Sequence, residues 1–349
     1  IPKDILTAET DLPLPSAADI RGYKPPAPAG KEQIALAASA LKSASRPLIF
    51  AGGGVSVAGA EKELLQLLEK SGAPLVTSLM GIGTVPADLP ANLGMIGMHG
   101  SYTANMAVQR ADLLVGVGVR FDDRATGDLA RFAPEAEIIH IDIDPTAIAR
   151  NVPVAIPVVG DAREVLFALC GLCDRETPSA WWDEIENFRR QSALRLPEPV
   201  ATDGDLSAQG VIRALGKTFP DAIVTSEVGQ NQMWAAQYFP FRSPRTWLTS
   251  GGLGTMGYGF PAAIGAQAGV PQKRVIDIAG DGSIQMNIQE LATAVLEGFP
   301  VIIAILNNGY LGMVRQWQEL FYNRRYAKTC LVSSAACPPD CSSPGETCP

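Results

Sequence analysis

The sequence predicts an α/β protein with two doubly wound, parallel-sheet domains. Short, continuously apolar runs alternate with segments of helical spacing, which is typical of strands buried on both faces and joined by helices. Two polar, Pro-containing stretches interrupt this alternation, one at the start of the chain and one at residues 174–206. The length of 349 residues also corresponds to two domains, at roughly 150 residues per domain.

Composition and charge exclude several other classes of protein. With 47% hydrophobic and 18% charged residues, the chain can form large cores and is not intrinsically disordered. Its 28 Lys and Arg against 36 Asp and Glu give a net charge of −8 without a basic cluster, so we expect no nucleic-acid partner. No apolar run reaches the ~18 residues of a membrane span, so we expect no membrane partner.

The first domain is predicted at residues 31–173, after a Pro-rich linker at residues 1–30. The predicted strands are Leu48–Ala51, Leu113–Val117 and Ile138–Ile141. Helical spacing follows at Glu61–Lys70 and Arg163–Leu169. This order predicts one parallel sheet with helices on both faces.

The second domain is predicted at residues 207–329, after a linker at residues 174–206 that holds one Trp-rich helix. Its predicted strands are Ala222–Thr225, Arg274–Ala279 and Pro300–Leu306, with helices beginning near Gly229, Gly257 and Gln285. Residues 330–349 are predicted as an irregular tail.

The six cysteines fall into two groups. Cys170 and Cys173 form a single Cys-x-x-Cys pair without the further ligands that a zinc site needs, so we interpret them as buried thiols. The other four, Cys330, Cys337, Cys341 and Cys348, lie in the tail, where a zinc or disulfide knot is the alternative to an unrelated or out-of-frame segment. The body of the chain is typical of a reduced, cytoplasmic protein.

Glycine and polar residues follow several predicted strands of the first domain. Gly52, Gly53 and Gly54 end the first strand, either as a plain tight turn or as a site for a nucleotide, although the Gly-x-Gly-x-x-Gly spacing is broken. Polar stretches at residues 97–100, 118–124 and 140–145 follow other strands. Ligands bind at this edge of open α/β sheets. For Asp142 and Asp144 the alternative interpretation is helix capping before Pro145.

The clearest pattern for a functional site is in the second domain. Gly280-Asp281-Gly282-Ser283 closes one predicted strand, and Asn307-Asn308-Gly309 closes the next. Neighbouring parallel strands would bring a carboxylate and an amide oxygen to one point, which suits Mg²⁺ with its remaining positions on phosphate and water. The helix near Gln285 would add its N-terminal dipole.

These motifs resemble those of thiamine-diphosphate-dependent enzymes, and within them the catalytic (large) subunit of acetolactate synthase, also called acetohydroxyacid synthase. The resemblance covers roughly residues 1–329. It rests on the strings at 280–283 and 307–308 together with those at 117–124, 140–145, 251–259 and 312–318.

The resemblance implies a central FAD domain and a diphosphate-binding domain. The implied FAD-binding residues are Gly52, Gly53, Gly54, His99, Gly100, Arg120, Asp123, Asp142 and Asp161. Asp281 and Asn308 match the Mg²⁺ ligands. The implied thiamine diphosphate contacts are Val228, Gly229, Gln230, Asn231, Gly254, Met256, Gly282 and Ser283. Without the motif, Met256 would be interpreted as an ordinary core residue.

The resemblance also implies a substrate channel and a reaction. The channel residues are Met98, Arg124, Met313, Val314 and Trp317, of which Arg124 would bind a ketoacid carboxylate. The cofactor would condense pyruvate with pyruvate or 2-ketobutyrate with loss of CO₂, a transferase step toward the branched-chain amino acids isoleucine and valine. The implied partners are a second copy in a homodimer or higher assembly and a small regulatory subunit.

The resemblance further implies that the chain is a fragment. The activating glutamate of the family lies in an N-terminal pyrimidine-binding domain, and Glu9 in the linker and Glu32 directly after it cannot replace it. The second domain is expected to be incomplete at its C-terminus, because the sequence departs from the family after about Lys328. We therefore expect this chain alone to be inactive.

Two other functions remain as alternatives. One is another thiamine enzyme of the glyoxylate carboligase, pyruvate oxidase or benzoylformate decarboxylase type, against which the strings around Arg124 and Trp317 argue. The other is a non-catalytic cofactor-binding or assembly module, which the lack of the glutamate favours. A dehydrogenase is disfavoured by the broken dinucleotide motif.

Overall fold

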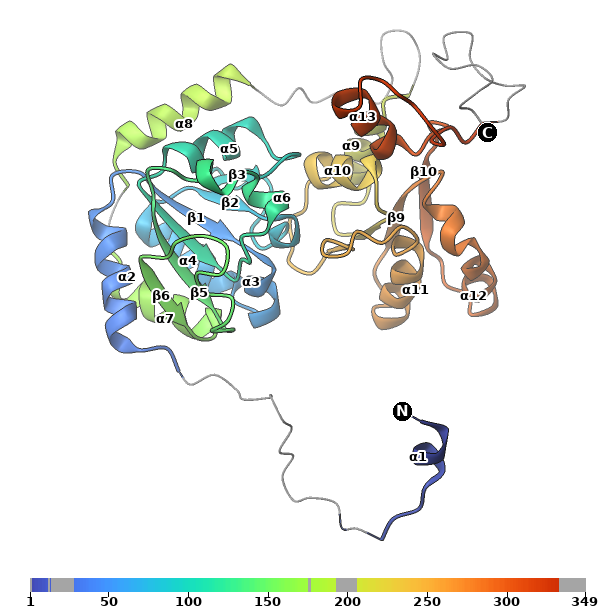
Figure 1. The fold of residues 1–349 in the computed structure, drawn as a ribbon, viewed down its shortest axis with the longest axis horizontal. Helices are drawn as coiled ribbons and strands as arrows, with labels where there is room; N and C mark the ends of the chain where they lie inside the picture. Colours follow the sequence, from blue (N-terminus) through green and yellow to red (C-terminus); the bar gives the residue numbers. More distant parts are fainter. Residues whose placement is uncertain (1, 12, 14–27, 175–176, 193–205, 333–349) are drawn as a thin grey trace.

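The computed structural model describes residues 2–11, 13, 28–174, 177–192 and 206–332, which contain two parallel sheets in two domains (Figure 1). The first sheet has six strands in the order β3-β2-β1-β4-β5-β6. Their bounds are β1 Pro47–Ala51, β2 Leu75–Thr77, β3 Asn92–Met95, β4 Leu113–Val117, β5 Glu137–Asp142 and β6 Ile156–Val159. All neighbouring pairs are parallel. The predicted doubly wound fold is therefore confirmed for this domain.

Helices cover both faces of the first sheet because its strands are apolar on both faces. Alternate residues of β1 enter opposite cores: Ile49 and Ala51 pack with one set of helices, and Leu48 and Phe50 with the other. Helices α2 (Lys31–Ser43), α4 (Glu61–Ser71) and α7 (Ala162–Leu172) supply residues to the first core, and α5 (Tyr102–Arg110) and α8 (Ser179–Gln191) to the second. The shorter elements are α1 (Lys3–Thr7), α3 (Gly53–Ala58), η1 (Leu79–Gly81), α6 (Asp123–Thr126) and η2 (Leu129–Arg131).

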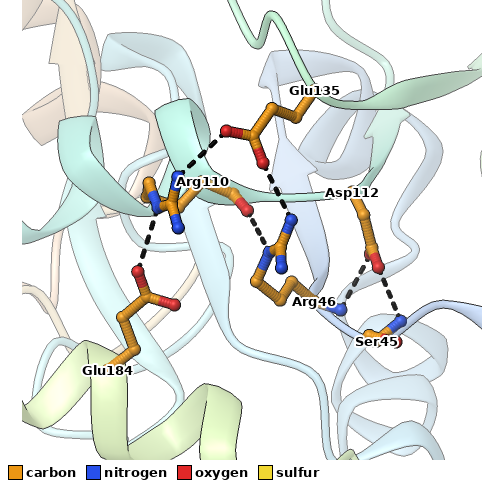
Figure 2. A network of polar contacts seen from close by, with 6 residues as sticks. All are labelled: Ser45, Arg46, Arg110, Asp112, Glu135 and Glu184. Carbon is orange, nitrogen blue, oxygen red and sulfur yellow. Dashed lines mark hydrogen bonds and ion pairs between the residues drawn. The ribbon is translucent and has the colours of Figure 1, made fainter.

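Helix α8 lies within the segment that the sequence indicates as a linker, yet it packs into the core of the first domain. The side chain of Trp181 is 1% exposed, and its indole N–H donates to the carbonyl of Pro47 at 3.0 Å. At the edge of this contact, Arg110 bonds Glu184 of α8 at 3.0 Å and Glu135 at 2.9 Å, and Glu135 also bonds Arg46 (Figure 2). Each of these partly exposed ion pairs contributes little to stability. The burial of Trp181 is therefore the main interaction that holds α8 against the first domain.

The second sheet has four parallel strands in the order β10-β9-β7-β8. Their bounds are β7 Ile223–Ser226, β8 Trp247–Thr249, β9 Val275–Gly280 and β10 Ile302–Leu306. The helices of this domain are α9 (Ala208–Thr218), α10 (Gln230–Tyr238), α11 (Gly259–Gly269), α12 (Leu291–Leu296) and α13 (Gly312–Phe321). Strand β9 is buried on both faces, with Ile276 and Ile278 in one core and Val275 and Ala279 in others.

The predicted α-helix beginning near Gln285 is not present in this form. Ile284–Glu290 is instead a 3₁₀ segment, η3, in which Asn287 departs from helical geometry, and α12 begins only at Leu291. The expectation of an α-helix dipole at Gln285 is therefore wrong. The side-chain amide of Asn287 donates to the carbonyl of Gly257 at 2.6 Å, which explains the kink: this residue bonds a neighbouring segment and leaves the helical path.

The two domains contact each other from strand β8 and helix α10 of the second domain to η1 and the loop after β3 of the first. The indole N–H of Trp247 donates to the carbonyl of Leu79 at 3.1 Å, and the side-chain amide of Gln237 donates to the carbonyl of His99 at 2.7 Å. In the part of the chain that the structure describes, no helix is long and apolar enough to cross a membrane.

Candidate cofactor site

An open pocket lies at the carboxyl edge of the second sheet. This is the edge at which parallel α/β sheets bind ligands. Its lining residues come from the ends of β7, β9 and β10 and from the start of α13; they are Val228, Gly229, Gln230, Asn231, Trp234, Met256, Gly280, Asp281, Gly282, Ser283, Leu306, Asn308, Tyr310, Leu311, Gly312, Met313 and Val314. The structure thus brings together all the predicted residues of the second domain except Gly254 and Trp317.

Asp281 and Asn308 lie on adjacent loops of this pocket. Oδ2 of Asp281 accepts a hydrogen bond from the backbone N–H of Gly309 at 3.1 Å, directly after Asn308. Oδ1 of Asn308 accepts from the N–H of Tyr310 at 3.0 Å, and its amide nitrogen donates to Gln230 at 3.4 Å. In the described residues, no hydrogen bond is made to Oδ1 of Asp281. The pocket therefore offers one carboxylate and one amide oxygen, the hard donors that suit Mg²⁺ shared with phosphate and water.

The loop before α10 is shaped by a glycine and fixed by a buried amide. Gly229 has φ +149°, a conformation that L side chains rarely adopt. The side chain of Asn231 is buried, and its amide donates to the carbonyls of Glu227 and Ile278 at 3.0 and 2.8 Å. Asn231 thus ties the ends of β7 and β9 together. Gly229, Gln230 and Asn231 at the start of α10 line the pocket, and the N-terminus of a helix suits an anion.

Ser283 and Gly312 both pack closely against their neighbours in the lining of this pocket. The hydroxyl of Ser283, which is 3% exposed, makes hydrogen bonds of 3.3 Å to the backbone N–H and carbonyl of Gly280. Ser283 therefore fixes the turn around Asp281. A Cβ on Gly312 would overlap the end of the Gln230 side chain and approach that of Asn308, so any larger residue here would displace both side chains.

Met256 lines the pocket, whereas Gly254 lies beside it. Gly254 has φ +65°, and a Cβ built on it would be 3.9 Å from Val228. Met256 thus contributes an apolar side chain to the lining of the pocket.

The predicted channel residues come from both domains. Met313 and Val314 line the pocket from the first turn of α13. On the same helix, the ring of Trp317 lies 5.8 Å from the guanidinium carbon of Arg124 in the first domain. Met98 is 57% exposed beside His99, whose pKa is held below its usual value by burial and by the positive charge of Arg124.

The comparisons with known proteins agree with this geometry. Residues 34–169 match the central domain of thiamine pyrophosphate enzymes, and residues 227–339 match their C-terminal, thiamine-pyrophosphate-binding domain. The chain belongs to the thiamine pyrophosphate enzymes. The second match contains all the residues that line the pocket, and it extends to residue 339, into the segment predicted to depart from the family.

Three relatives narrow the resemblance. The acetolactate synthase large subunit of Corynebacterium glutamicum is 49% identical over 347 residues, which are 97% of this chain and 55% of the relative. The isozyme 3 large subunit of Escherichia coli is 45% identical over 95% of this chain and 59% of the relative. The probable large subunit of Methanocaldococcus jannaschii is 45% identical over 96% of this chain and 58% of the relative. The chain thus spans little more than half the length of these relatives.

The predicted FAD residues of this thiamine pyrophosphate enzyme also lie at a single sheet edge. The backbone N–H groups of Gly52 and Gly54 donate to the carbonyls of Val117 and Gly118 at 2.9 and 3.0 Å. A Cβ on either glycine would overlap Gly118, so this close packing by itself requires glycine. The carbonyl of Arg120 accepts from Asn151 at 2.9 Å, and that of Asp142 from Gly160 at 2.9 Å, close to Asp161. His99, Gly100 and Asp123 follow β3 and β4 at the same edge.

Helix capping is observed for Asp161, whereas the capping predicted for Asp142 and Asp144 is wrong, because residues 145–149 form turns and no helix. Oδ1 of Asp161 accepts from the N–H groups of Arg163 and Glu164 at the start of α7. Oδ1 of Asp142 accepts from the N–H of Asp144 at 2.9 Å, and Oδ1 of Asp144 from that of Thr146 at 2.8 Å. These carboxylates fix the strand-end loops.

Two buried acidic residues behind the pocket are absent from the sequence prediction. Glu227 and Asp277 are both 0% exposed. The available signals were an acidic residue directly before the Val228–Asn231 loop and an Asp that interrupts the apolar strand Val275–Ala279. Neither Glu227 nor Asp277 belongs to a recognisable sequence motif, so only the structure relates the two residues to each other.

The predicted thiols can be compared with the structure only in part. Cys170 and Cys173 are buried thiols, as predicted, and neither forms a disulfide among the described residues. Burial raises the pKa of the Cys170 thiol, which keeps it protonated. Cys330 is also buried and forms no disulfide with another described residue, whereas Cys337, Cys341 and Cys348 lie outside the described residues.

Proposed function

We propose that this protein is the catalytic chain of an acetolactate synthase that binds thiamine diphosphate and Mg²⁺ in its second domain. One observation carries the proposal. The loop of Gly229, the Asp281 turn, Asn308 and Met256 line one pocket, although they come from separate elements. Their arrangement combines hard oxygen donors, a helix N-terminus and an apolar wall, which are the three surfaces that a metal-bound diphosphate with an aromatic ring system requires.

The residues around the pocket suggest a division of roles. Asp281 and Asn308 would hold Mg²⁺, and the N–H groups from Gly229 onward would bind the diphosphate. Met256 would support the ring system from its apolar side. When bound, thiamine diphosphate would accept the electron pair released by decarboxylation of a 2-ketoacid and deliver it to a second 2-ketoacid.

The substrate residues would act by binding and by exclusion of water. Arg124 would orient the carboxylate of the incoming 2-ketoacid, pyruvate or 2-ketobutyrate, through charge-assisted hydrogen bonds. Trp317, Met313 and Val314 would shape an apolar pocket for the acceptor's alkyl group, and Met98 would close it from the first domain. Such positioning lowers the barrier by fixing the reacting groups at short range.

The remaining parts of the proposal concern FAD, assembly and pathway. The first sheet presents the predicted FAD residues at one edge, which supports FAD there. We further propose a homodimer or larger assembly, a small regulatory subunit, a cytoplasmic location, and a role in the synthesis of isoleucine and valine.

Calorimetric titration of the chain with thiamine diphosphate tests the cofactor site. We expect saturable binding with Mg²⁺ present and strong weakening when the metal is chelated, because the diphosphate alone would face Asp281 uncompensated. No binding in either condition would contradict the proposal.

The catalytic activity of the 349-residue chain is a separate proposal from its binding of thiamine diphosphate. We propose that it forms no acetolactate from pyruvate by itself, even with thiamine diphosphate, Mg²⁺ and FAD in excess, because we identify no residue in it with the family's activating glutamate. General acid–base help of this kind contributes ~10²–10⁴-fold. Acetolactate above the enzyme-free background would refute this expectation.

A further inference from the structure

The side chain of Glu227 connects the sheet to the segment that carries Met256. Glu227 follows β7 directly, and its carboxylate accepts two backbone hydrogen bonds from the chain before and within α11. Oε2 accepts from the N–H of Gly257 at 2.6 Å, and Oε1 accepts from that of Phe260 at 3.0 Å. With 0% exposure, no solvent competes for these bonds.

These bonds occupy the N-terminus of α11, which an anion stabilises. The first N–H groups of a helix have no partner in the helix, and a carboxylate there satisfies them and complements the helix dipole. Burial raises the pKa of Glu227, and the N–H groups of Phe260, Gly257, Gly259 and Tyr258 oppose this effect. Because every one of these groups is a donor, they favour the ionised carboxylate.

The contact is too close for the helix to shift easily. A Cβ on Gly259 would lie 2.5 Å from the backbone nitrogen of Glu227 and 2.6 Å from the carbonyl carbon of Ser226. It would also overlap the carboxyl group of Asp277. The start of α11 therefore lies directly against β7 and β9, and Glu227 determines where the preceding residues leave the sheet.

Met256 is one residue before the N–H that Glu227 binds. Gly257 has φ +87°, so the chain turns sharply between Met256 on the pocket wall and the helix. The amide of Asn287 donates to the carbonyl of the same Gly257 at 2.6 Å. Both polar groups of the Gly257 backbone are thus held, one by Glu227 and one by Asn287.

We propose that Glu227 is a positioning residue for the cofactor pocket: its buried carboxylate anchors Gly257 and the start of α11, and so fixes Met256 against the bound thiamine diphosphate. This role rests on the proposed function for its ligand and extends it to a residue that does not line the pocket. The carboxylate acts through backbone amides and has no contact with the reacting groups.

Glu227→Gln tests the role in the 349-residue chain. The Gln side chain has nearly the same shape but one oxygen acceptor, so one of the two amides loses its bond. We expect faster hydrogen exchange at residues 256–260 without ligand, and at least ~10-fold weaker Mg²⁺-dependent binding of thiamine diphosphate, the equivalent of one lost hydrogen bond to a charged group.

Ser207→Ala is the matched control. Ser207 caps α9 in the same domain by accepting from the N–H of Gly210 at 3.2 Å, and it does not line the pocket. Its loss should lower the stability of the domain without changing exchange at 256–260 or the affinity for thiamine diphosphate. Equal effects of the two variants on affinity would overturn the proposal, because Glu227 would then act only through general stability.

Two further results distinguish a failure of this proposal from a failure of the proposed function. If Glu227→Gln does not fold, Glu227→Asp retains the charge with a shorter reach, and we expect it to show the same faster exchange and weaker binding in smaller degree; wild-type values would overturn the proposal. If the wild-type chain binds no thiamine diphosphate, the proposed function fails, and exchange in the unliganded variants still decides whether Glu227 anchors this segment.

Discussion

The guanidinium group of Arg124 lies over the indole ring of Trp317, with 5.8 Å between the guanidinium carbon and the ring centroid. Arg124 belongs to α6 of the first domain and Trp317 to α13 of the second. The contact therefore links the loop after β4 to the helix that begins at the cofactor pocket. Trp317 in turn packs against Phe321, with ring centroids 5.4 Å apart.

A double-mutant cycle measures this link. We expect Arg124→Ala and Trp317→Ala to show a coupling of about 0.5–1 kcal/mol in the free energy of unfolding, as for an exposed cation–π pair. Denaturant unfolding of the two single variants and the double variant measures it. Strictly additive effects would show that the two domains do not hold this contact in solution.

Asp281→Asn should weaken the Mg²⁺-dependent binding of thiamine diphosphate by about 10–100-fold, the loss of one charged ligand. The Asn oxygen can still accept from the N–H of Gly309, so the melting temperature should change little. Asp221→Asn, an exposed change of the same charge in this domain, is the control and should bind like the wild type. Unaltered binding by Asp281→Asn would remove Asp281 from the metal site.

Two glycines of α11 should respond oppositely to alanine. A Cβ on Gly259 would meet the backbone of Glu227 and Ser226, so Gly259→Ala should destabilise the protein by about 1–3 kcal/mol. A Cβ on Gly265 would meet no atom within 4 Å, so Gly265→Ala should stabilise by about 0.4–1 kcal/mol. Thermal unfolding compares them, and similar shifts for both would contradict the packing described at Gly259.

The buried carboxyl group of Asp277 should make stability depend on pH. Burial, together with the negative charge of Glu227, raises the pKa of Asp277 to about 8. Oδ1 of Asp277 accepts from the hydroxyl of Thr225 at 3.1 Å, whereas Oδ2 has no partner among the described residues. The surrounding elements β7, β10 and α11 contain no ionisable side chain, and Glu290 of η3 bonds Thr293.

The direction of this pH dependence follows from the number of protons that Asp277 binds in the folded and in the unfolded state. Unfolded Asp277 ionises near pH ~4, so between about pH 4 and 8 the folded chain keeps a proton that the unfolded chain has released. Its contribution to the free energy of unfolding therefore falls as pH rises, by at most ~1.4 kcal/mol per pH unit. Asp277→Asn mimics the protonated group, and its stability relative to wild type should increase from pH 5 to pH 8. Urea unfolding at both values measures this; a constant difference would mean that Asp277 is ionised throughout.

Much of the fold could be predicted because it is encoded locally. Apolar runs such as Leu113–Val117 specify buried strands in whatever context they occur, and their alternation with helices specifies a parallel sheet. The pocket in the second domain could also be located, because Asp281 and Asn308 each follow a strand, and parallel strands deliver their carboxyl ends to one edge. In the described residues, the structure confirms both.

Contacts between distant segments were decided only by the tertiary structure. The sequence placed α8 in a linker, since nothing local shows that Trp181 fills a cavity beside Pro47. The kink at Asn287 and the anchor formed by Glu227 depend on the backbone of Gly257, which lies on another element. Side-chain type and spacing determined which segments form strands and where polar groups cluster, whereas packing decided which buried groups pair, because burial removes water and leaves each polar group only the partners that the fold brings within reach.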